Sequence, residues 1–166
     1  MFALIPKRRA FSLVELVVVI VIIGILAAMA IPRLSRGSAG ASSASLAGNL
    51  AIVRNAINMY AAEHNNKFPG DGGADMVAQL TTYTSATGAT NASKTAVYKF
   101  GPYLVAIPPC PVGNAANPSD VLIDTTNSPP TVNTTGGEGW VYNPTTGEFI
   151  ANTNDTDETG KAYSAY

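Results

Sequence analysis

The longest apolar stretch of the chain lies close to its N-terminus. Residues 16–31 carry no charged or strongly polar side chain, and Val and Ile dominate them. A helix rises about 1.5 Å per residue, so a helix over residues 11–31 would measure about 31 Å, which matches the ~30 Å hydrocarbon layer of a bilayer. Because only a helix satisfies its own backbone polar groups in lipid, we predict a membrane-spanning helix here.

A second apolar pattern follows a stretch that is rich in Gly, Ser and Ala. Its apolar residues recur at spacings of four and three, which places them on one face of a helix. These residues are Leu46, Leu50, Val53, Ile57 and Tyr60. We expect this face to form core with the rest of the chain, and we expect the helix to end near residues 63–66, before Phe68-Pro69-Gly70.

Residues 67–166 are rich in Thr, Asn, Gly and Pro, a composition that favours loops and short strands. Asp75 is suited to cap a short helix. The apolar residues of that helix are Met76, Val77, Leu80 and Tyr83. Strands are predicted at 121–123 and in a hairpin of 139–142 with 148–151, and the aromatic residues of the hairpin are expected to face the core.

These patterns together predict an α+β fold. A long N-terminal helix, with a membrane-spanning half and an amphipathic half, is expected to pack on a small, loop-rich head that contains β-strands.

Glu15 is the only charged residue between positions 11 and 31. A carboxylate in an apolar helix is costly to insert and is by default a functional group that needs a partner. If the chain were cut between Ala10 and Phe11, the new α-amino group of Phe11 in a neighbouring copy would supply that partner. The charged pair, stabilised in a medium of low dielectric, would fix the stagger of one helix against the next.

Basic residues on both sides of the apolar stretch indicate its orientation in a membrane. Lys7, Arg8 and Arg9 precede it, whereas only Arg33 and Arg36 follow it closely. The side with more Lys and Arg stays in the cytoplasm, so we expect the N-terminus there and the head across the membrane.

A secretory signal peptide is an alternative interpretation of the same residues. It also has a basic start and an apolar centre, and Ala28-Met29-Ala30 would be its small-x-small cleavage site. Cleavage after Ala30 would release a soluble binding module that begins at Ile31. Glu15 argues against this alternative, because a discarded segment has no use for a costly carboxylate.

The N-terminal residues resemble those of type IV pilins and of type II secretion pseudopilins. The resemblance rests on three features: the run Lys7-Arg8-Arg9-Ala10-Phe11-Ser12-Leu13-Val14-Glu15-Leu16, the apolar helix after it, and Gly24-Ile25-Leu26-Ala27-Ala28-Met29-Ala30-Ile31-Pro32. Ala10 stands where the family usually has Gly.

The resemblance implies a defined processing and assembly. A prepilin peptidase would cut after Ala10 on the cytoplasmic face, and the new amino group of Phe11 would be methylated. Glu15 would guide the docking of subunits into a helical fibre. Pro32, which lacks a backbone donor, is expected to kink the helix, and the helix between Gly24 and Pro32 would lose its helicity on assembly.

The family also implies an organisation, a location and partners for this chain. Residues 1–10 would be a leader, residues 11–66 a helix whose part 11–31 is membrane span and fibre core, and residues 67–166 a periplasmic or extracellular head. The protein would cross the inner membrane once with its head in the periplasm. Its partners would be further copies in a fibre, the prepilin peptidase, an inner-membrane assembly platform and minor pseudopilins.

Within this family, the sequence favours a pseudopilin of type II secretion over a type IV pilus subunit used for adhesion, motility or DNA uptake. Many such pilins close a C-terminal loop with two cysteines, and this chain has only Cys110, which we expect to be a small, semi-buried apolar residue. The helix end from Asn55 through Tyr60 to Asn66 and Pro69 is also similar to that of G-type pseudopilins.

An acidic group near the C-terminus is the candidate ligand set for a metal ion. Asp155, Asp157 and Glu158 lie within four residues, among Asn, Thr and Gly. Oxygen ligands of this kind suit a hard cation such as Ca²⁺, although the spacing is not that of an EF-hand. The heads of G-type pseudopilins often hold a C-terminal calcium loop, so the resemblance also favours calcium; the alternative is a solvated acidic turn.

Composition argues against several other classes of protein. The 166 residues include one His and one Cys, so most hydrolase triads have no residues to form them. The net charge is −1, and loss of the three basic residues in 1–10 would leave −4, which argues against nucleic-acid binding. His64, with no ligand partner near it in sequence, is expected to be solvated. We therefore predict a structural protein rather than an enzyme.

Overall fold

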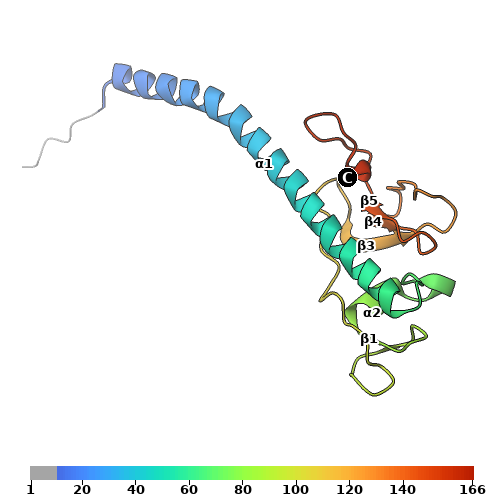
Figure 1. The fold of residues 1–166 in the computed structure, drawn as a ribbon. Coiled ribbons are helices and arrows are strands. Elements are labelled where there is room, and N and C mark those ends of the chain that lie inside the picture. The colour runs from blue at the N-terminus through green and yellow to red at the C-terminus, as the bar shows by residue number, and fades with distance from the viewer. Residues whose placement is uncertain (1–10) are drawn as a thin grey trace, which may run out of the picture. The chain divides into compact units, whose positions relative to one another are not determined.

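The computed structural model describes residues 11–166, with the side chains of all of these except 31–36. Ala10, one of the two residues at the expected cleavage site, lies outside the described residues. The chain divides into an N-terminal unit that ends at Ser38 and a head unit, Ala39–Tyr166. The chain passes from one unit to the other within helix α1 (Leu13–Glu63) (Figure 1).

The predicted apolar stripe of α1 forms the core of the head unit. Leu46, Leu50, Val53, Ile57 and Tyr60 are all 0–3% exposed. They pack with buried residues of α2 (Met76–Thr81) and of the sheet. These partners are Met76, Leu80, Trp140, Tyr142 and Phe149. Burial of each large side chain stabilises the fold by about 1.5–3 kcal/mol, so this stripe fastens the second half of α1 to the head.

Helix α1 ends where its backbone becomes left-handed. The last helical residue is Glu63, and Asn65 and Asn66 have φ angles of 57° and 63°. Asn adopts this conformation more readily than most residues. The backbone N–H of Asn66 donates to the carbonyl of Ala61 (2.8 Å), which satisfies a carbonyl group of the last turn.

The main sheet has the strand order β3-β4-β5. Strands β4 (Glu138–Tyr142) and β5 (Phe149–Ala151) form the predicted hairpin. Strand β3 (Asn117–Ile123) is longer than the predicted 121–123 and pairs with β4 in parallel. A parallel neighbour requires a long connection, and residues 124–137 supply it without helix or strand of their own.

Helix α2 begins as predicted and ends earlier. The carboxylate of Asp75 accepts from the backbone N–H groups of Val77 (2.9 Å) and Ala78 (3.1 Å). Tyr83, expected in this helix, instead lies in β1 (Tyr83–Thr84), which pairs with β2 (Thr90–Asn91). The hydroxyl groups of the β-branched Thr81 and Thr82 bond to carbonyls four residues back, and such residues are poor at continuing a helix. Single 3₁₀ turns lie at Asp71–Gly73 and Tyr163–Ala165.

The aromatic residues of the hairpin lie in the core, as expected. The indole N–H of Trp140 donates to the carbonyl of Pro108 (2.8 Å), and the hydroxyl of Tyr142 donates to the carbonyl of Pro69 (2.9 Å). Cys110 is also buried, and burial raises the pKa of its thiol. The polar tips of the large rings are thus satisfied inside the core.

The prediction for His64 is wrong, because its side chain is buried. Nδ1 lies 2.8 Å from the carbonyl oxygen of Tyr60, and Nε2 lies 3.0 Å from both Ser85 O and Thr84 Oγ1. The imidazole also stacks on the ring of Tyr60, with 3.8 Å between the centroids. The segment that follows α2 covers the end of α1, and this is a long-range contact that no local pattern indicates.

Candidate functional site

The N-terminal unit exposes apolar side chains along the first part of helix α1, Leu13–Ala30. Residues Leu13–Ala30 of α1 are long and apolar enough to cross a membrane, and no part of this stretch is buried. A contiguous apolar surface of this size is rare on a soluble monomer and marks an interaction with lipid or protein. Within residues 11–166, this is the one helical stretch with that property.

Glu15 occupies the first turn of α1, and Phe11 lies just before the helix begins. Both side chains are exposed. The backbone N–H groups of the first turn have no partner inside the helix, and their partial positive charge stabilises a carboxylate nearby. Among the described side chains, which leave out those of 31–36, the one ion pair joins Lys67 and Asp71 (3.3 Å), so none of these side chains gives Glu15 a cationic partner.

Helix α1 runs without a break from Gly24 through Pro32. The side chain of Pro32 is not among those described, so the expected kink is not tested. The expected loss of helicity concerns the assembled fibre and stays a prediction.

The three acidic residues near the C-terminus, Asp155, Asp157 and Glu158, have different surroundings and do not form one cluster. The carboxylate of Asp157 closes its own turn. It accepts from the hydroxyl and N–H of Thr159 (2.6 and 2.8 Å), from Lys161 N (3.0 Å) and from the hydroxyl of Tyr166 (2.6 Å). These hydrogen bonds, that of the Thr159 hydroxyl foremost, hold the pKa of Asp157 well below its usual range. Glu158 is exposed.

Asp155 shares a pocket of about 250 Å³ with Glu138, Asn152 and Asn154. One carboxylate oxygen of Glu138, Oε2, is buried without a hydrogen-bond partner among the described residues. A buried polar atom without a protein partner can be satisfied by an ordered water or by an ion. Among the described residues, no group of three or more His, Cys, Asp or Glu side chains is arranged to hold a metal ion. The structure therefore places Asp155 and Glu138 in the lining of one pocket, and Glu138 is a residue that sequence reasoning did not single out.

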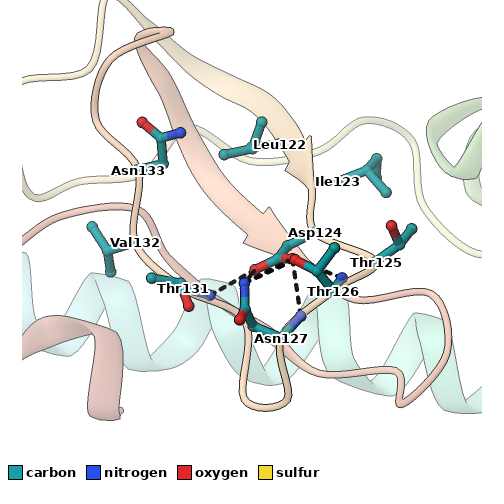
Figure 2. A pocket seen from close by; sticks show the side chains of 9 residues that line it. All are labelled: Leu122, Ile123, Asp124, Thr125, Thr126, Asn127, Thr131, Val132 and Asn133. Carbon is teal, nitrogen blue, oxygen red and sulfur yellow. Dashed lines mark hydrogen bonds between the residues drawn. The ribbon is translucent and has the colours of Figure 1, made fainter.

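Another pocket, of about 420 Å³, lies over the loop between β3 and β4 (Figure 2). Asp124, directly after β3, points into this loop and accepts from the N–H and hydroxyl of Thr126, the N–H and amide of Asn127, and the N–H of Thr131. These bonds, that from the Thr131 backbone foremost, hold the pKa of Asp124 well below its usual range. Because the carboxylate oxygens of Asp124 already accept these hydrogen bonds, we assign Asp124 the role of stabilising the loop and not that of binding a ligand.

Sequence reasoning also missed this role of Asp124, although a local signal existed. An Asp whose side chain can bond the backbone two and three residues later is a common turn former, and Thr126 and Asn127 stand at those positions. The contact with Thr131 could not be read from that motif.

One family model matches the chain, and it covers residues 5–31. It describes the prokaryotic N-terminal methylation motif. The motif is that of pilin-like proteins, which are structural subunits that a prepilin peptidase processes and that assemble into fibres at a membrane. No curated protein and no solved structure matches the chain. The match includes Ala10, Phe11 and Glu15 and leaves the head unit without a matched relative.

Proposed function

We propose that this chain is a structural subunit of a pilus-like fibre, and that the fibre is the pseudopilus of a type II secretion system. One observation carries the proposal: the methylation motif at residues 5–31 coincides with a helix whose apolar surface is uncovered. The head unit, in contrast, has a complete core of its own. In a subunit of this kind, lipid or neighbouring protein would cover the apolar N-terminal helix.

Processing would create the charge pair on which assembly depends. A prepilin peptidase would cut between Ala10 and Phe11, and the α-amino group of Phe11 would then be methylated. In the fibre this cation would lie against Glu15 of a neighbouring copy. Two opposite charges attract more strongly in an apolar medium than in water, and removal of one partner leaves a costly unpaired charge, so misaligned neighbours would be rejected.

Before assembly, the bilayer would cover the apolar half of α1. The N-terminus would lie in the cytoplasm because Lys7, Arg8 and Arg9 precede the span. The head would then lie in the periplasm. From there an assembly platform and minor pseudopilins would add the subunit to the growing fibre. In the fibre, the helix between Gly24 and Pro32 would lose its helicity.

A soluble module cut after Ala30 has less support. Helix α1 continues through this position into the head unit, so such a cut would fall within a helix. Mass spectrometry of the mature protein separates the two cases. An N-methylated Phe11 at the N-terminus supports the fibre subunit, and an N-terminal Ile31 refutes it.

The pseudopilus is favoured over an adhesive or motile pilus by the C-terminal region. Cys110 is the only cysteine of the chain, so no intramolecular disulfide closes that region. The turn at Asp157 and the bond from Tyr166 to it hold the chain end instead. A deletion strain tests this choice: loss of secreted proteins supports the pseudopilus, and loss of surface fibres with normal secretion supports the pilus.

We also propose that the head binds calcium near its C-terminus. The sequence predicts Asp155, Asp157 and Glu158 as its ligands. The proposal is supported by the unpartnered buried oxygen of Glu138, a residue that lines the same pocket as Asp155, Asn152 and Asn154, since carboxylate and amide oxygens are the ligands that Ca²⁺ prefers.

A further inference from the structure

Strand β3 forms one edge of the main sheet, and part of this edge is open. The backbone N–H of Asp124, directly after β3, donates to the carbonyl of Tyr142 in β4 (2.9 Å). Successive residues of a strand point to alternate sides, so the N–H and carbonyl groups of Ile123 and Val121 point away from β4. Among the described residues, no backbone group outside the β3–β4 ladder bonds to them. An edge of this kind can pair with a further strand.

An irregularity in β3 marks where the open part of the edge begins. Strand β3 has three residues, 118–120, opposite Gly139 of β4 alone. Bulges of this kind bend a strand and redirect its side chains. The carbonyl of Pro118 in the bulge accepts from the N–H of Cys110 (2.9 Å). The edge is therefore paired at the bulge and open from Val121 onward.

A groove with mostly aliphatic walls lies beside this open edge. We call it the edge groove; it measures about 550 Å³ and is lined by residues of α2, of the segment 105–107 and of β3. Val77, Val105 and Val121 are among its lining residues. Val105 is 100% exposed and Val77 37%. Apolar side chains around a concave surface are typical of a binding site.

One charged group of the edge groove has no partner. The side chain of Glu138 lines this groove as well as the pocket that it shares with Asp155. Its Oε2 is buried, and no described residue donates a hydrogen bond to it. A charge removed from water is costly unless an opposite charge or a donor pairs with it. A cationic group that enters the groove would offset this cost.

We infer that the edge groove binds an extended segment of a partner protein, which adds to β3 as a further strand and places a Lys or Arg side chain beside Glu138. Lys and Arg join a cationic end to an aliphatic stem, so the stem matches the valine walls and the end matches the carboxylate. In strand addition, backbone hydrogen bonds supply affinity and side-chain pockets supply specificity. The open backbone groups of Val121 and Ile123 would form those bonds.

The charge of the head favours a different protein over a second copy of this chain as the occupant. Residues 39–166 carry ten acidic and five basic side chains. Two heads with the same excess of negative charge repel each other, whereas a basic segment is attracted to the head. The segment that docks is therefore assigned to a basic partner.

Peptide binding to the full-length, detergent-solubilised chain tests the inference. The probe is the end-capped, fluorescently labelled peptide Thr-Val-Thr-Lys-Thr-Val-Thr, whose Lys and Val side chains share one face of a strand. A chelator is present, so that no metal ion pairs with Glu138. We expect saturable binding by fluorescence anisotropy, and at least tenfold weaker binding of the same peptide with Glu in place of Lys. No binding up to ~1 mM, a concentration that detects even weak association, would refute the inference.

Two variants and a matched control locate the binding site. Glu138→Gln and Val105→Lys should each weaken binding at least tenfold, the second because it places a cation of its own at the groove. Val105 is fully exposed, so this variant should unfold at the same temperature as the unaltered chain. Asp120→Asn is the control: Asp120 also lines the groove but is exposed, and exposed charges contribute little. An equal loss from Asp120→Asn would show attraction by net charge alone and would overturn the assigned site.

Hydrogen exchange tests the strand addition itself. The peptide should slow the exchange of the N–H groups of Val121 and Ile123, which lack a backbone partner in the free chain. Unchanged rates at both positions would refute pairing with the edge. Self-association of the unaltered chain that Glu138→Gln abolishes would assign the groove to a second copy and would overturn the proposed partner.

Discussion

At the scale of single residues, polar side chains fix the loops of the head unit. The amide of Asn152 donates to the carbonyls of Asn133 (2.7 Å) and Glu138 (2.9 Å). Asn143 accepts from the backbone of the β4–β5 turn. Backbone groups that lack a partner are costly away from water, so these side chains stabilise long connections that have no ladder of their own.

Substitution of Asp124 tests this role through its pH dependence. The pKa of Asp124 is lowered in the folded protein, so its carboxylate stabilises the fold above its unfolded pKa of about 3.9. That stabilisation is lost as the pH falls through the folded value. We expect Asp124→Asn to lower the thermal midpoint at pH 7, and the difference from the unaltered chain to vanish in strong acid. Asp120→Asn, at an exposed carboxylate of β3, should show no such change, and an equal effect of both variants would contradict the assignment.

His64 is expected to hold the segment after α2 against the end of α1. His64→Leu removes the ring nitrogens that bond Thr84 and Ser85, and loss of buried hydrogen bonds costs about 1–3 kcal/mol of stability. Denaturant unfolding measures this loss. Hydrogen exchange should also quicken at Thr84 and Phe100, whose backbones pair; unchanged rates there would show that the ring does not fasten the segment.

Calcium binding is checked by thermal unfolding with calcium or a chelator. We expect calcium to raise the midpoint, because a ligand that binds only the folded state stabilises it. Glu138→Gln and Asp155→Asn should remove the effect. If calcium shifts the unaltered chain and neither variant changes the shift, the ion binds elsewhere; no shift at all refutes calcium binding.

At the scale of elements, α1 carries two stripes of the same spacing that differ in burial. The stripe through Ile57 is buried in the head core, whereas the second stripe is exposed. We call this second stripe the outer stripe; it consists of Ala41, Ser45, Gly48, Ile52, Asn55, Met59 and Ala62. The spacing alone predicts only that the members of each stripe lie on one face of the helix. The difference between them is which face the head covers.

Paired alanine substitutions separate the two stripes. Ile57→Ala should lower the unfolding free energy of the head by about 2–5 kcal/mol, because it leaves a cavity in a packed core. Ile52→Ala should stay within about 0.5 kcal/mol of the unaltered chain, as exposed substitutions do. Denaturant titration in detergent compares them, and a similar loss for both would show that the outer stripe also belongs to the core.

At the scale of the whole molecule, the two units differ in how much of their apolar surface the chain itself covers. The head unit contains the described core and folds around the second half of α1. The apolar stretch Leu13–Ala30 of the N-terminal unit is not buried within the described chain, so we expect lipid or protein around it to cover it.

Glu15→Ala tests the proposed register of neighbouring subunits. The variant should insert into the membrane as before, because it removes a costly charge from the span. Fibres should be lost, because the amino group of Phe11 no longer has its partner. Electron microscopy and membrane fractionation measure the two effects, with Asp120→Ala, at an exposed carboxylate of the head, as the control. Normal fibres from Glu15→Ala would contradict the register argument.

The sequence by itself determined the features that depend on neighbours along the chain. The membrane-spanning length, the lone Glu15, the buried stripe of α1, the cap at Asp75 and the β4–β5 hairpin all follow from periodicity, hydropathy and turn chemistry. Each of these is a local property, and local propensities act over a few residues.

Only the tertiary structure decided which groups from distant parts of the chain meet. It buried His64 under the segment after α2, paired β3 with β4 in parallel, placed Asp155 and Glu138 in the lining of one pocket and left the outer stripe of α1 uncovered. The physical reason is that burial and long-range hydrogen bonds depend on chain closure over tens of residues. A stripe at helical spacing has the same pattern in the sequence whether the head covers it or leaves it exposed.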